Sequence, residues 1–422
     1  MKAVSFIPHT SYLIPHTSYL MKILSLAPTS FFGDYGCHVR ILEEARALKI
    51  LGHDVTILTY YKGNDVPGFK VIRTNPTPWH KDYEVGSSRH KFAFDALLAV
   101  RLLRVLSKNM FDVIHAHLHE GALIAGMLAK AWRIPVCFDY QGSLTDEMKQ
   151  HGFVRHNWAI SGASKLERFI NRLPDAIFTS TKHAAESLQQ ELGPNNAVHH
   201  LPDGVNADVF TPHVLSPDEH IAMRAVHGIG PDEPVVAFLG LLARHQGIAN
   251  LIEAASLIKQ QGRTVRWLVM GYPGVAEWRN AAVQAGVGDE LIFTGRVPYA
   301  QAPRMLAMGD IAIAPKLSLT EGSGKLLNYM AMGLPTVAFD TPAQREYLGH
   351  LGVYAPMGDS AALARQVLHL LDHPEQRRAL AEKLRLRARQ HFGWDRGAVL
   401  MESVYKQLTH QPVSLVVERK KL

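Results

Sequence analysis

One stretch, Glu321 to Asn328, combines a turn of small residues with a carboxylate, a cation and an amide. It reads EGSGKLLN, follows an apolar run suited to a buried parallel strand, and leads into residues with helical periodicity. Lys325 lies on the first turn of that helix, where the helix dipole disfavours a cation unless an anion is bound beside it. Because helix N-termini after glycine-rich loops bind phosphate groups, the stretch predicts a phosphate site. An ordinary strand, loop and helix with a solvated lysine explains the same pattern equally well.

The side chains of this stretch suggest how such a site would work. Lys325 would neutralise the phosphate, and Ser323 is suited to be the N-cap of the helix. Glu321 and Asn328 can hydrogen-bond to the hydroxyls of a ribose or a sugar. The backbone amides that would contact the phosphate belong to Gly322, Ser323 and Gly324.

Length and composition indicate a globular protein of two domains. The chain has 422 residues, of which 47% are hydrophobic and 20% are charged. No uninterrupted apolar segment reaches the length of about 18 residues that spans a bilayer. Cys37 and Cys137 are too few for a disulfide framework and lack the spacing of metal ligands. These features favour a reducing cytoplasm and argue against a structural metal.

The net charge of +7 suits an anionic ligand or an anionic membrane surface. A nucleic-acid partner is not favoured, because the lysines and arginines are scattered and no aromatic residues are interleaved with them. A helix is predicted over Lys91–Lys108, with a broad apolar face and a basic face. Packing of that helix on a sheet is the favoured interpretation, ahead of membrane docking.

The N-terminal residues repeat a heptapeptide. IPHTSYL at Ile7–Leu13 recurs without change at Ile14–Leu20, and Met21-Lys22-Ile23 then resembles a new protein start. The segment lacks the long apolar core of a signal peptide. We expect residues 1–20 to be a disordered extension that adds nothing to the fold.

Apolar runs alternate with amphipathic segments along the rest of the chain, which predicts doubly wound α/β domains. In the first half, strands are predicted at Ile23–Ala27, Gly52–Thr59, Lys70–Thr74, Asp112–Ala116, Pro135–Tyr140 and Ala176–Ser180. In the second half, they are predicted at Val235–Leu239, Trp267–Met270, Leu291–Thr294, Ile311–Pro315, Thr336–Phe339 and Val353–Tyr354.

The two series join near Leu201–Phe210, which is rich in turn formers, and Pro212–Asp232 is predicted to be a polar loop. The predicted domains are therefore residues 21–205 and 206–395, followed by a last helix at Arg396–Leu408. Two consecutive domains of this kind, without a sequence repeat between them, make a bilobed protein. Ligands of such a protein bind between the lobes, beyond the carboxyl ends of the strands.

Seven motifs occur in a set order between Met21 and Leu408. They are the glycine loop before Cys37–Arg40, GHDV at Gly52–Val55, DVIHAH at Asp112–His117, LPDGVNADVF at Leu201–Phe210, FLGLLARHQG at Phe238–Gly247, FTGRVP at Phe293–Pro298, and the segment from Glu321 to Asp340. Together they resemble the GT-B glycosyltransferases of family 4, the retaining group 1 enzymes.

The resemblance implies an α/β fold of two Rossmann-like, doubly wound domains facing across a cleft. The C-terminal domain would hold a nucleotide-sugar donor, and the N-terminal domain a glycan, lipid or small-molecule acceptor. The last helix, within residues 396–422, would cross back to the first domain. The activity implied is that of a metal-independent, hexosyltransferase-like enzyme of polysaccharide biosynthesis, without a cofactor. Its expected location is the cytoplasm, with room for peripheral contact with the inner face of the membrane.

Several positions depart from the pattern of the family. Many members hold the diphosphate with an arginine and a lysine where this chain has Leu241 and Gln246, and Arg244 is the substitute available in the same loop. Asn328 stands where the ribose-binding glutamate is usual. Gln141 stands where many members have an active-site histidine.

A retaining transfer develops negative charge on the leaving phosphate, so fixed donors aimed at that charge should contribute most. Lys325 and Gly36, which come from opposite domains, suit that role, and Arg296 is expected near the nucleobase. The departing phosphate can accept the proton of the acceptor, so Gln141 is tolerated there without a strong base. Glu321 would orient sugar hydroxyls. The predicted catalytic residues are thus Glu321, Lys325 and Gln141.

Three other interpretations stay open. His115, His117 and His119 could point together from a strand and bind a metal, although the family has no metal there. A nucleotide-sugar 2-epimerase would share the two lobes but needs carboxylates as acid and base near the sugar. A non-catalytic nucleotide-sugar binder would have lost part of the phosphate-binding site.

Overall fold

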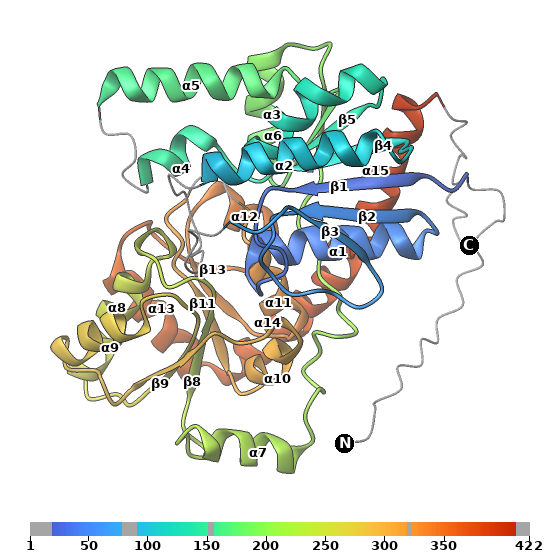
Figure 1. Cartoon of the computed structure of the whole chain (residues 1–422). Coiled ribbons are helices and arrows are strands. Elements are labelled where there is room, and N and C mark those ends of the chain that lie inside the picture. Colours follow the sequence, from blue (N-terminus) through green and yellow to red (C-terminus); the bar gives the residue numbers. More distant parts are fainter. Residues whose placement is uncertain (1–18, 78–90, 151–155, 319–321, 411–422) are drawn as a thin grey trace.

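The computed structural model describes residues 19–77, 91–150, 156–318 and 322–410 of the chain. These residues form two α/β lobes, each built on one parallel sheet with helices on both faces (Figure 1). The predicted fold of two Rossmann-like domains is therefore confirmed. The extension predicted at residues 1–20 lies almost wholly outside the described residues. Within the described part of the chain, no helix is both long enough and apolar enough to cross a membrane.

The N-terminal lobe contains a seven-stranded sheet in the order β3-β2-β1-β4-β5-β6-β7. Its strands are β1 Lys22–Ala27, β2 Asp54–Thr59, β3 Lys70–Arg73, β4 Val113–His117, β5 Val136–Tyr140, β6 Ala176–Thr179 and β7 Ala197–His200. Neighbouring strands are parallel, with Leu24 of β1 opposite Ile114 of β4. The central strands are buried on both faces, as expected for a parallel sheet covered by helices.

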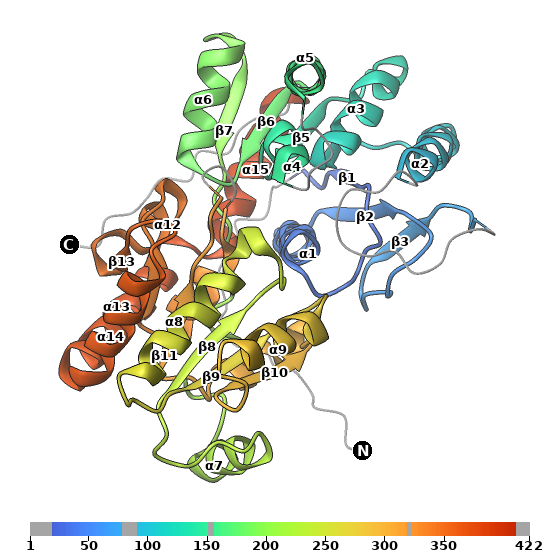
Figure 2. The same cartoon turned by 90° about the vertical axis from the view of Figure 1, so that its left-hand side faces the viewer.

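Alternate residues of these strands pack against different helical layers. Ile23 and Ile57 belong to the core under α1 and α15, whereas Leu24 and Leu58 belong to the core under α2 and α3. Figure 2 shows α1 on one side of β1 and β2, and α2 and α3 on the other. The helices are α1 Gly36–Ile50, α2 Lys91–Leu106, α3 Leu118–Leu128, α4 Leu144–Gln150, α5 Asn157–Asn171, α6 Lys182–Leu192 and α15 Trp394–Leu408, with a 3₁₀ turn at Ala129–Trp132.

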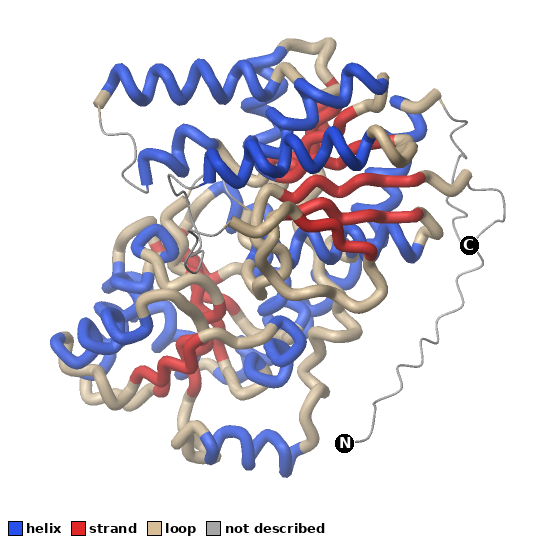
Figure 3. The backbone as a smooth tube through the Cα atoms, in the orientation of Figure 1, coloured by secondary structure: helices blue, strands red, loops and turns tan. Residues whose placement is uncertain are grey.

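The C-terminal lobe has a six-stranded sheet in the order β10-β9-β8-β11-β12-β13. Its strands are β8 Val235–Leu239, β9 Arg266–Met270, β10 Leu291–Gly295, β11 Ile311–Ala314, β12 Thr336–Phe339 and β13 Val353–Ala355. The helices are α7 Pro217–Val226, α8 Ile248–Gln260, α9 Val275–Gln284, α10 Ala302–Leu306, α11 Gly324–Ala331, α12 Pro342–Leu348, α13 Ser360–Asp372 and α14 Pro374–His391. Three 3₁₀ turns lie at Arg244–Gln246, Tyr299–Gln301 and Gly349–Leu351. Figure 3 shows the strands of both lobes enclosed by helices.

Two elements differ from the sequence prediction. The predicted loop at Pro212–Asp232 contains α7, whose start has a complete capping box formed by Ser216 and Glu219, with Pro217 at its first position. The edge strand β7, with sequence AVHH, was not predicted. It is short and only half buried, so it lacks the apolar run by which the other strands are recognised.

The chain passes between the lobes twice. Leu201 packs in the N-terminal core, but Val205 and Phe210 pack in the C-terminal one. On the way back, Phe392 belongs to the C-terminal core and Trp394 to the N-terminal one. Helix α15 begins at Trp394, two residues before the predicted start, and packs along α1.

A buried arginine in α1 joins these connections to the first sheet. Arg40 lies 2.8 Å from Asp139 of β5, 2.8 Å from Asp203 of the crossing segment and 3.0 Å from Glu44 of its own helix. It also donates to the carbonyl oxygen of Leu201 at 3.2 Å. Burial alone would lower the pKa of this guanidinium, but the three carboxylates raise it well above its usual value. Arg40 is therefore charged, and it holds three segments together.

Further contacts join the lobes on both sides of Arg40. Tyr347 of α12 donates its hydroxyl to the carbonyl oxygen of Ser180 at 2.9 Å. At the loop before α1, the hydroxyl of Tyr272 donates to the carbonyl oxygen of Gly33 at 3.0 Å. The backbone N–H of Tyr299 donates to Asp34 Oδ1 at 2.9 Å. The lobes are thus in direct contact at each edge of the space between them.

Replacing Arg40 with methionine should lower the free energy of unfolding by about 3–5 kcal/mol, because it leaves buried carboxylates without their cation. Urea denaturation followed by circular dichroism measures the change. The control is Arg263→Met, in the other lobe. Arg263 pairs with Asp372 at 2.7 Å, and the two side chains are 45% and 47% exposed, so its loss should cost less than about 1 kcal/mol. Equal losses for the two variants would contradict the structural role given to Arg40.

Candidate functional site

A cavity of about 470 Å³ lies between the two lobes. Its walls come from the residues that follow the carboxyl ends of β1, β4, β5 and β6 in one lobe, and of β8, β9 and β11 in the other. In each sheet the strand order reverses at this place, between β1 and β4 and between β8 and β11. Open α/β sheets bind ligands at such points, so the cavity is the predicted site.

Helix α11 begins at Gly324 and directs its N-terminus at the cavity. Gly322, Ser323, Gly324, Lys325 and Asn328 all line it. Ser323 occupies the predicted N-cap position, but its side chain makes no capping hydrogen bond. Its ψ of 69° differs from the ψ of 149° and 155° of the residues that cap helices α6 and α12. The Ser323 hydroxyl is instead buried without a hydrogen-bond partner among the described residues.

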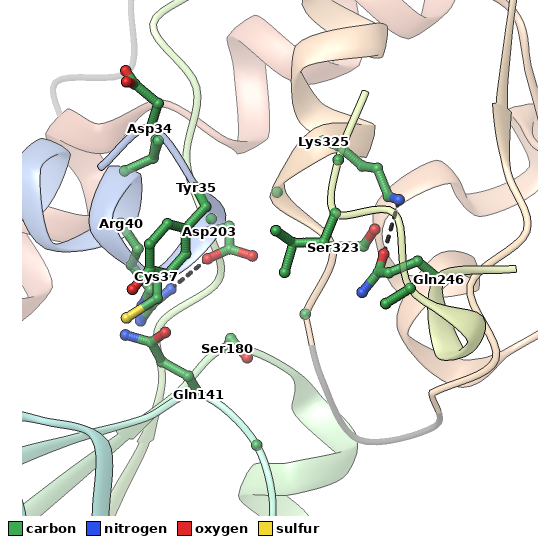
Figure 4. A pocket seen from close by; sticks show the side chains of 18 of the residues that line it. Asp34, Tyr35, Cys37, Arg40, Gln141, Ser180, Asp203, Gln246, Ser323 and Lys325 are labelled. Carbon is green, nitrogen blue, oxygen red and sulfur yellow. Dashed lines mark hydrogen bonds and ion pairs between the residues drawn. The ribbon is translucent and has the colours of Figure 1, made fainter. Parts of the chain in front are cut away.

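The side chain of Lys325 extends toward β8 and the loop that follows this strand. Its Nζ donates to Gln246 Oε1 at 3.0 Å and lies 4.3 Å from the centre of the Phe238 ring. Gly240 leaves the room for this, because a Cβ there would lie 3.2 Å from Nζ. Figure 4 shows Lys325 and Gln246 together on the C-terminal side of the cavity. The Lys325 ammonium group is therefore held near the N-terminus of α11.

The opposite wall is the start of α1. Gly36 is the first residue of that helix and lines the cavity, with no atom within 4 Å of the place where a Cβ would stand. Tyr35 and Cys37 flank it (Figure 4). Burial, followed by the charge of Asp139, raises the pKa of the Cys37 thiol well above its usual range, which favours the neutral thiol. Two helix N-termini, those of α1 and α11, thus face one space.

Gln141 follows β5 and lines the cavity beside Cys37 (Figure 4). Its amide nitrogen donates to Asp139 Oδ2 at 2.7 Å. His117 Nδ1 donates to the same oxygen at 3.0 Å. The position that the resemblance assigns to an active-site histidine therefore holds an amide that is anchored to a buried carboxylate.

Two of the predicted site residues, Arg244 and Arg296, do not line the cavity. Glu321 is outside the described residues. Arg244 is exposed in the 3₁₀ turn after β8, and it is not among the residues that line the cavity. Arg296 does not line the cavity either, because its guanidinium stacks on the ring of Tyr272 at 4.1 Å. Tyr272 itself does line it, and Arg296 is exposed.

The three histidines do not point together, so that expectation is wrong for His119. His115 and His117 face one side of β4, with ring centroids 4.6 Å apart. The strand ends there, and Leu118, with φ of +59°, turns the chain into α3. His119 consequently lies on a helix, 3.6 Å from Glu167.

His115 and His117 instead join Glu44 and Asp139 in a buried cluster, whose potential ligand atoms lie within 4.8 Å of one another. The guanidinium of Arg40 contacts both carboxylates of the cluster. A divalent ion would have to displace or repel that charge, so Arg40 already serves as the cation of the cluster.

Sequence reasoning missed four residues of the site. Arg40 and Asp203 stand inside recognised motifs but were given no role. Lys316, directly after β11, lines the cavity and donates to the carbonyl oxygen of Gly322 at 2.7 Å. Ser180, after β6, lines it with a hydroxyl that has no partner among the described residues. The one available signal was position, because Lys316 and Ser180 each follow the carboxyl end of a predicted strand.

Comparisons with known proteins agree with this geometry. Residues 35–204 match the family model described as "Glycosyl transferase 4-like domain", and residues 220–387 match "Glycosyl transferases group 1". The 2-deoxystreptamine glucosyltransferase of Streptomyces kanamyceticus is 26% identical over 364 residues, which cover 80% of this chain and 89% of that protein.

Two solved structures share the fold. The sucrose-phosphate synthase of Thermosynechococcus elongatus superimposes with a TM-score of 0.78 at 19% identity, over 92% of this chain and 99% of that one. Anabaena HepE in complex with UDP-glucose superimposes with a TM-score of 0.71 at 16% identity, over 91% of this chain and 100% of that one. The two matching family models together span both lobes and the cavity between them, and the chain is a GT-B glycosyltransferase of group 1.

Proposed function

We propose that this glycosyltransferase takes a sugar from a nucleotide-sugar and transfers it, with retention of configuration, to a hydroxyl of a glycan, a lipid or a small molecule. The observation that carries the proposal is the position of Lys325 at the N-terminus of α11, facing the cavity between the lobes. A cation and a helix N-terminus together form a site for the diphosphate of a donor. The neighbour HepE is bound to UDP-glucose, which makes that compound the first donor to test.

The proposed leaving-group site needs no metal ion. Lys325 supplies a cation, and the first N–H groups of α1 and α11 face the cavity from opposite walls. Negative charge that develops on the departing phosphate would meet these fixed donors. The departing phosphate oxygen would then accept the proton of the acceptor hydroxyl, so no separate base is required. This division of roles favours retention without a cofactor.

The acceptor would enter from the N-terminal lobe. That wall carries groups able to hydrogen-bond to hydroxyls, among them Ser143 and Glu147. The curated relative from Streptomyces is named for a small-molecule acceptor, 2-deoxystreptamine. A nucleotide-sugar 2-epimerase is less well supported, because two cavity carboxylates have other partners: Asp203 pairs with Arg40, and Asp34 accepts from Tyr299.

We further propose that a lipid acceptor is reached from the cytoplasmic face of a membrane. The outer side of the layer formed by α2, α3 and α5 exposes large apolar side chains, including Phe92 at 81% and Trp158 at 79%. The same three helices and the residues that follow them carry exposed basic residues, namely Arg104, Lys108, Lys130, Lys165, Arg168 and Arg172. Aromatic and basic side chains in one layer suit the anionic headgroup region of a bilayer.

Lys325→Ala should weaken binding of UDP-glucose about 10- to 100-fold, the usual value of a charge-assisted contact to phosphate. Isothermal titration calorimetry with UDP and UDP-glucose measures this, followed by a panel of other nucleotide-sugars. Lys259→Ala is the control, because Lys259 lies on the surface of α8 and pairs with Glu290 at 2.7 Å. Unchanged affinity in the Lys325 variant would remove that lysine from the donor site.

Turnover of the donor should survive EDTA within about twofold, because lysines and helix N-termini occupy the role that a metal has in other transferases. Release of the nucleotide is measured before and after chelation, in the same protein preparation. Loss of activity that Mg²⁺ or Mn²⁺ restores would contradict the proposed metal-independent mechanism.

The full chain should co-sediment with vesicles of phosphatidylglycerol more than with vesicles of phosphatidylcholine, and Trp158→Ser should reduce that binding several-fold, roughly as expected for loss of one buried aromatic ring. Val226→Ser is the matched control, because Val226 is equally exposed but lies on α7 of the other lobe. Equal binding to both kinds of vesicle, or equal effects of the two substitutions, would exclude this surface as the docking site.

A further inference from the structure

The cavity wall contains the side-chain amide of Gln141, whose orientation is set by the buried carboxylate of Asp139. Asp139 belongs to β5 and Gln141 follows the last residue of that strand, and a hydrogen bond of 2.7 Å joins their side chains. Asp139 is fully buried, whereas Gln141 is partly exposed and lines the cavity. The carboxylate therefore lies behind the amide, on the protein side of the wall.

Asp139 is an ionised group with its oxygens fully engaged. Burial alone would raise its pKa, but the charge of Arg40 and the hydrogen bond from His117 hold the pKa well below its usual value. Oδ1 accepts from Arg40 Nε at 2.9 Å, and Oδ2 accepts from His117 Nδ1 and from Gln141 Nε2. An ionised carboxylate can only accept hydrogen bonds.

This property determines which end of the Gln141 amide faces the cavity. The atom 2.7 Å from Asp139 must be the amide nitrogen, because an oxygen there would meet another acceptor. The Gln141 side chain also hydrogen-bonds that of Cys37. The carbonyl oxygen Oε1 is thereby turned away from Asp139. Figure 4 shows the amide nitrogen on the side away from Ser180 and the oxygen nearer to it.

We propose that Asp139 is a positioning residue for sugar transfer, which holds Gln141 so that Oε1 faces the transferred sugar. There the oxygen accepts a hydrogen bond from a sugar hydroxyl. Its partial negative charge stabilises the positive charge of the oxocarbenium-like transition state. The inference rests on the proposed function, since it concerns the sugar of the nucleotide-sugar donor. It also concerns specificity: a sugar with a hydroxyl or an ammonium at this place is accepted, and one with a carboxylate or a phosphate is repelled.

The competing explanation is that Asp139 serves only to neutralise Arg40. Asp139→Asn distinguishes positioning of Gln141 from neutralisation of Arg40, because asparagine keeps an oxygen for Arg40 but turns an NH₂ group toward Gln141. The Gln141 amide must then rotate and present its nitrogen to the cavity. His117 can adapt by changing tautomer, with Ser25, 2.9 Å from its Nε2, as partner.

Asp139→Asn should lower kcat about 10- to 100-fold, the range for one misdirected group that acts on transition-state charge, and change the Kd for UDP-glucose less than about threefold. The rate is measured as release of UDP from UDP-glucose. Adding Gln141→Glu to this variant should restore most of the loss, because the new carboxylate accepts from the NH₂ group introduced by Asp139→Asn and still presents an oxygen to the cavity. Glu44→Gln is the control, since Glu44 contacts Arg40 but not Gln141.

A double-mutant cycle distinguishes positioning from structural support. Gln141→Met removes the amide and keeps its length, so Asp139→Asn should cost little more kcat in that background. An equal cost in both backgrounds, or no recovery with Gln141→Glu, would show that Asp139 acts only through Arg40, and the proposal would fall.

A spectroscopic measurement needs no substrate. In protein labelled with ¹⁵N-glutamine, the side-chain NH₂ signal of Gln141 is assigned by its loss in Gln141→Met. Asp139→Asn should shift that signal, and Glu44→Gln should leave it in place. A signal that does not respond to Asp139→Asn would overturn the inference whether or not the enzyme uses UDP-glucose. Failure of every nucleotide-sugar to bind would instead overturn the proposed function and leave this result standing.

Discussion

The structure depends on one buried guanidinium that is surrounded by carboxylates. Arg40 joins α1 to β5 through Asp139 and to the segment between the lobes through Asp203. A charge in this position is stable because carboxylates compensate it in a region from which water is excluded, and loss of the arginine would leave those carboxylates without their cation. The orientation of the lobes and the position of α1 are therefore set by the same interaction.

The same constraint shapes the cavity. Asp203 stands so close to the turn before α11 that a Cβ on Gly322 would lie 2.8 Å from its carboxylate oxygen, so only glycine fits there. This close approach brings the first turn of α11 to the wall built by α1. On the same side of the cavity as α11, Lys325 extends to Gln246 in the loop after β8. A cation of this wall is therefore supplied by the first turn of a helix.

Much of the architecture was predictable, because apolar runs and turn formers mark the buried strands and their ends. Helix α7 was also within reach, since Ser216, Pro217 and Glu219 form a recognisable capping box that the prediction overlooked. The role of Arg40 was not predictable, because a charged residue in a helix is usually solvated. Its partners lie 99 and 163 residues away, and only the folded sheet brings them together. For Ser323 the local signal gave the N-cap position correctly but not the absence of its capping hydrogen bond.

The site residues were also predictable where backbone position alone places them, and not where side-chain contacts do. Lys325, Gly36 and the turn at Gly322–Gly324 lie on the cavity, as their positions after strands and at helix starts suggest. Arg244 and Arg296 do not line it, because in a loop the direction of a side chain depends on contacts such as the stacking of Arg296 on Tyr272. Sequence periodicity carries no information about those contacts.

The most direct measurement is a crystal structure of the protein with UDP-glucose bound. The account predicts phosphate oxygens within hydrogen-bond distance of Lys325 Nζ and of the first amides of α11, with the sugar between that helix and Gln141. A diphosphate bound away from α11, or a sugar that faces away from Gln141, would contradict it.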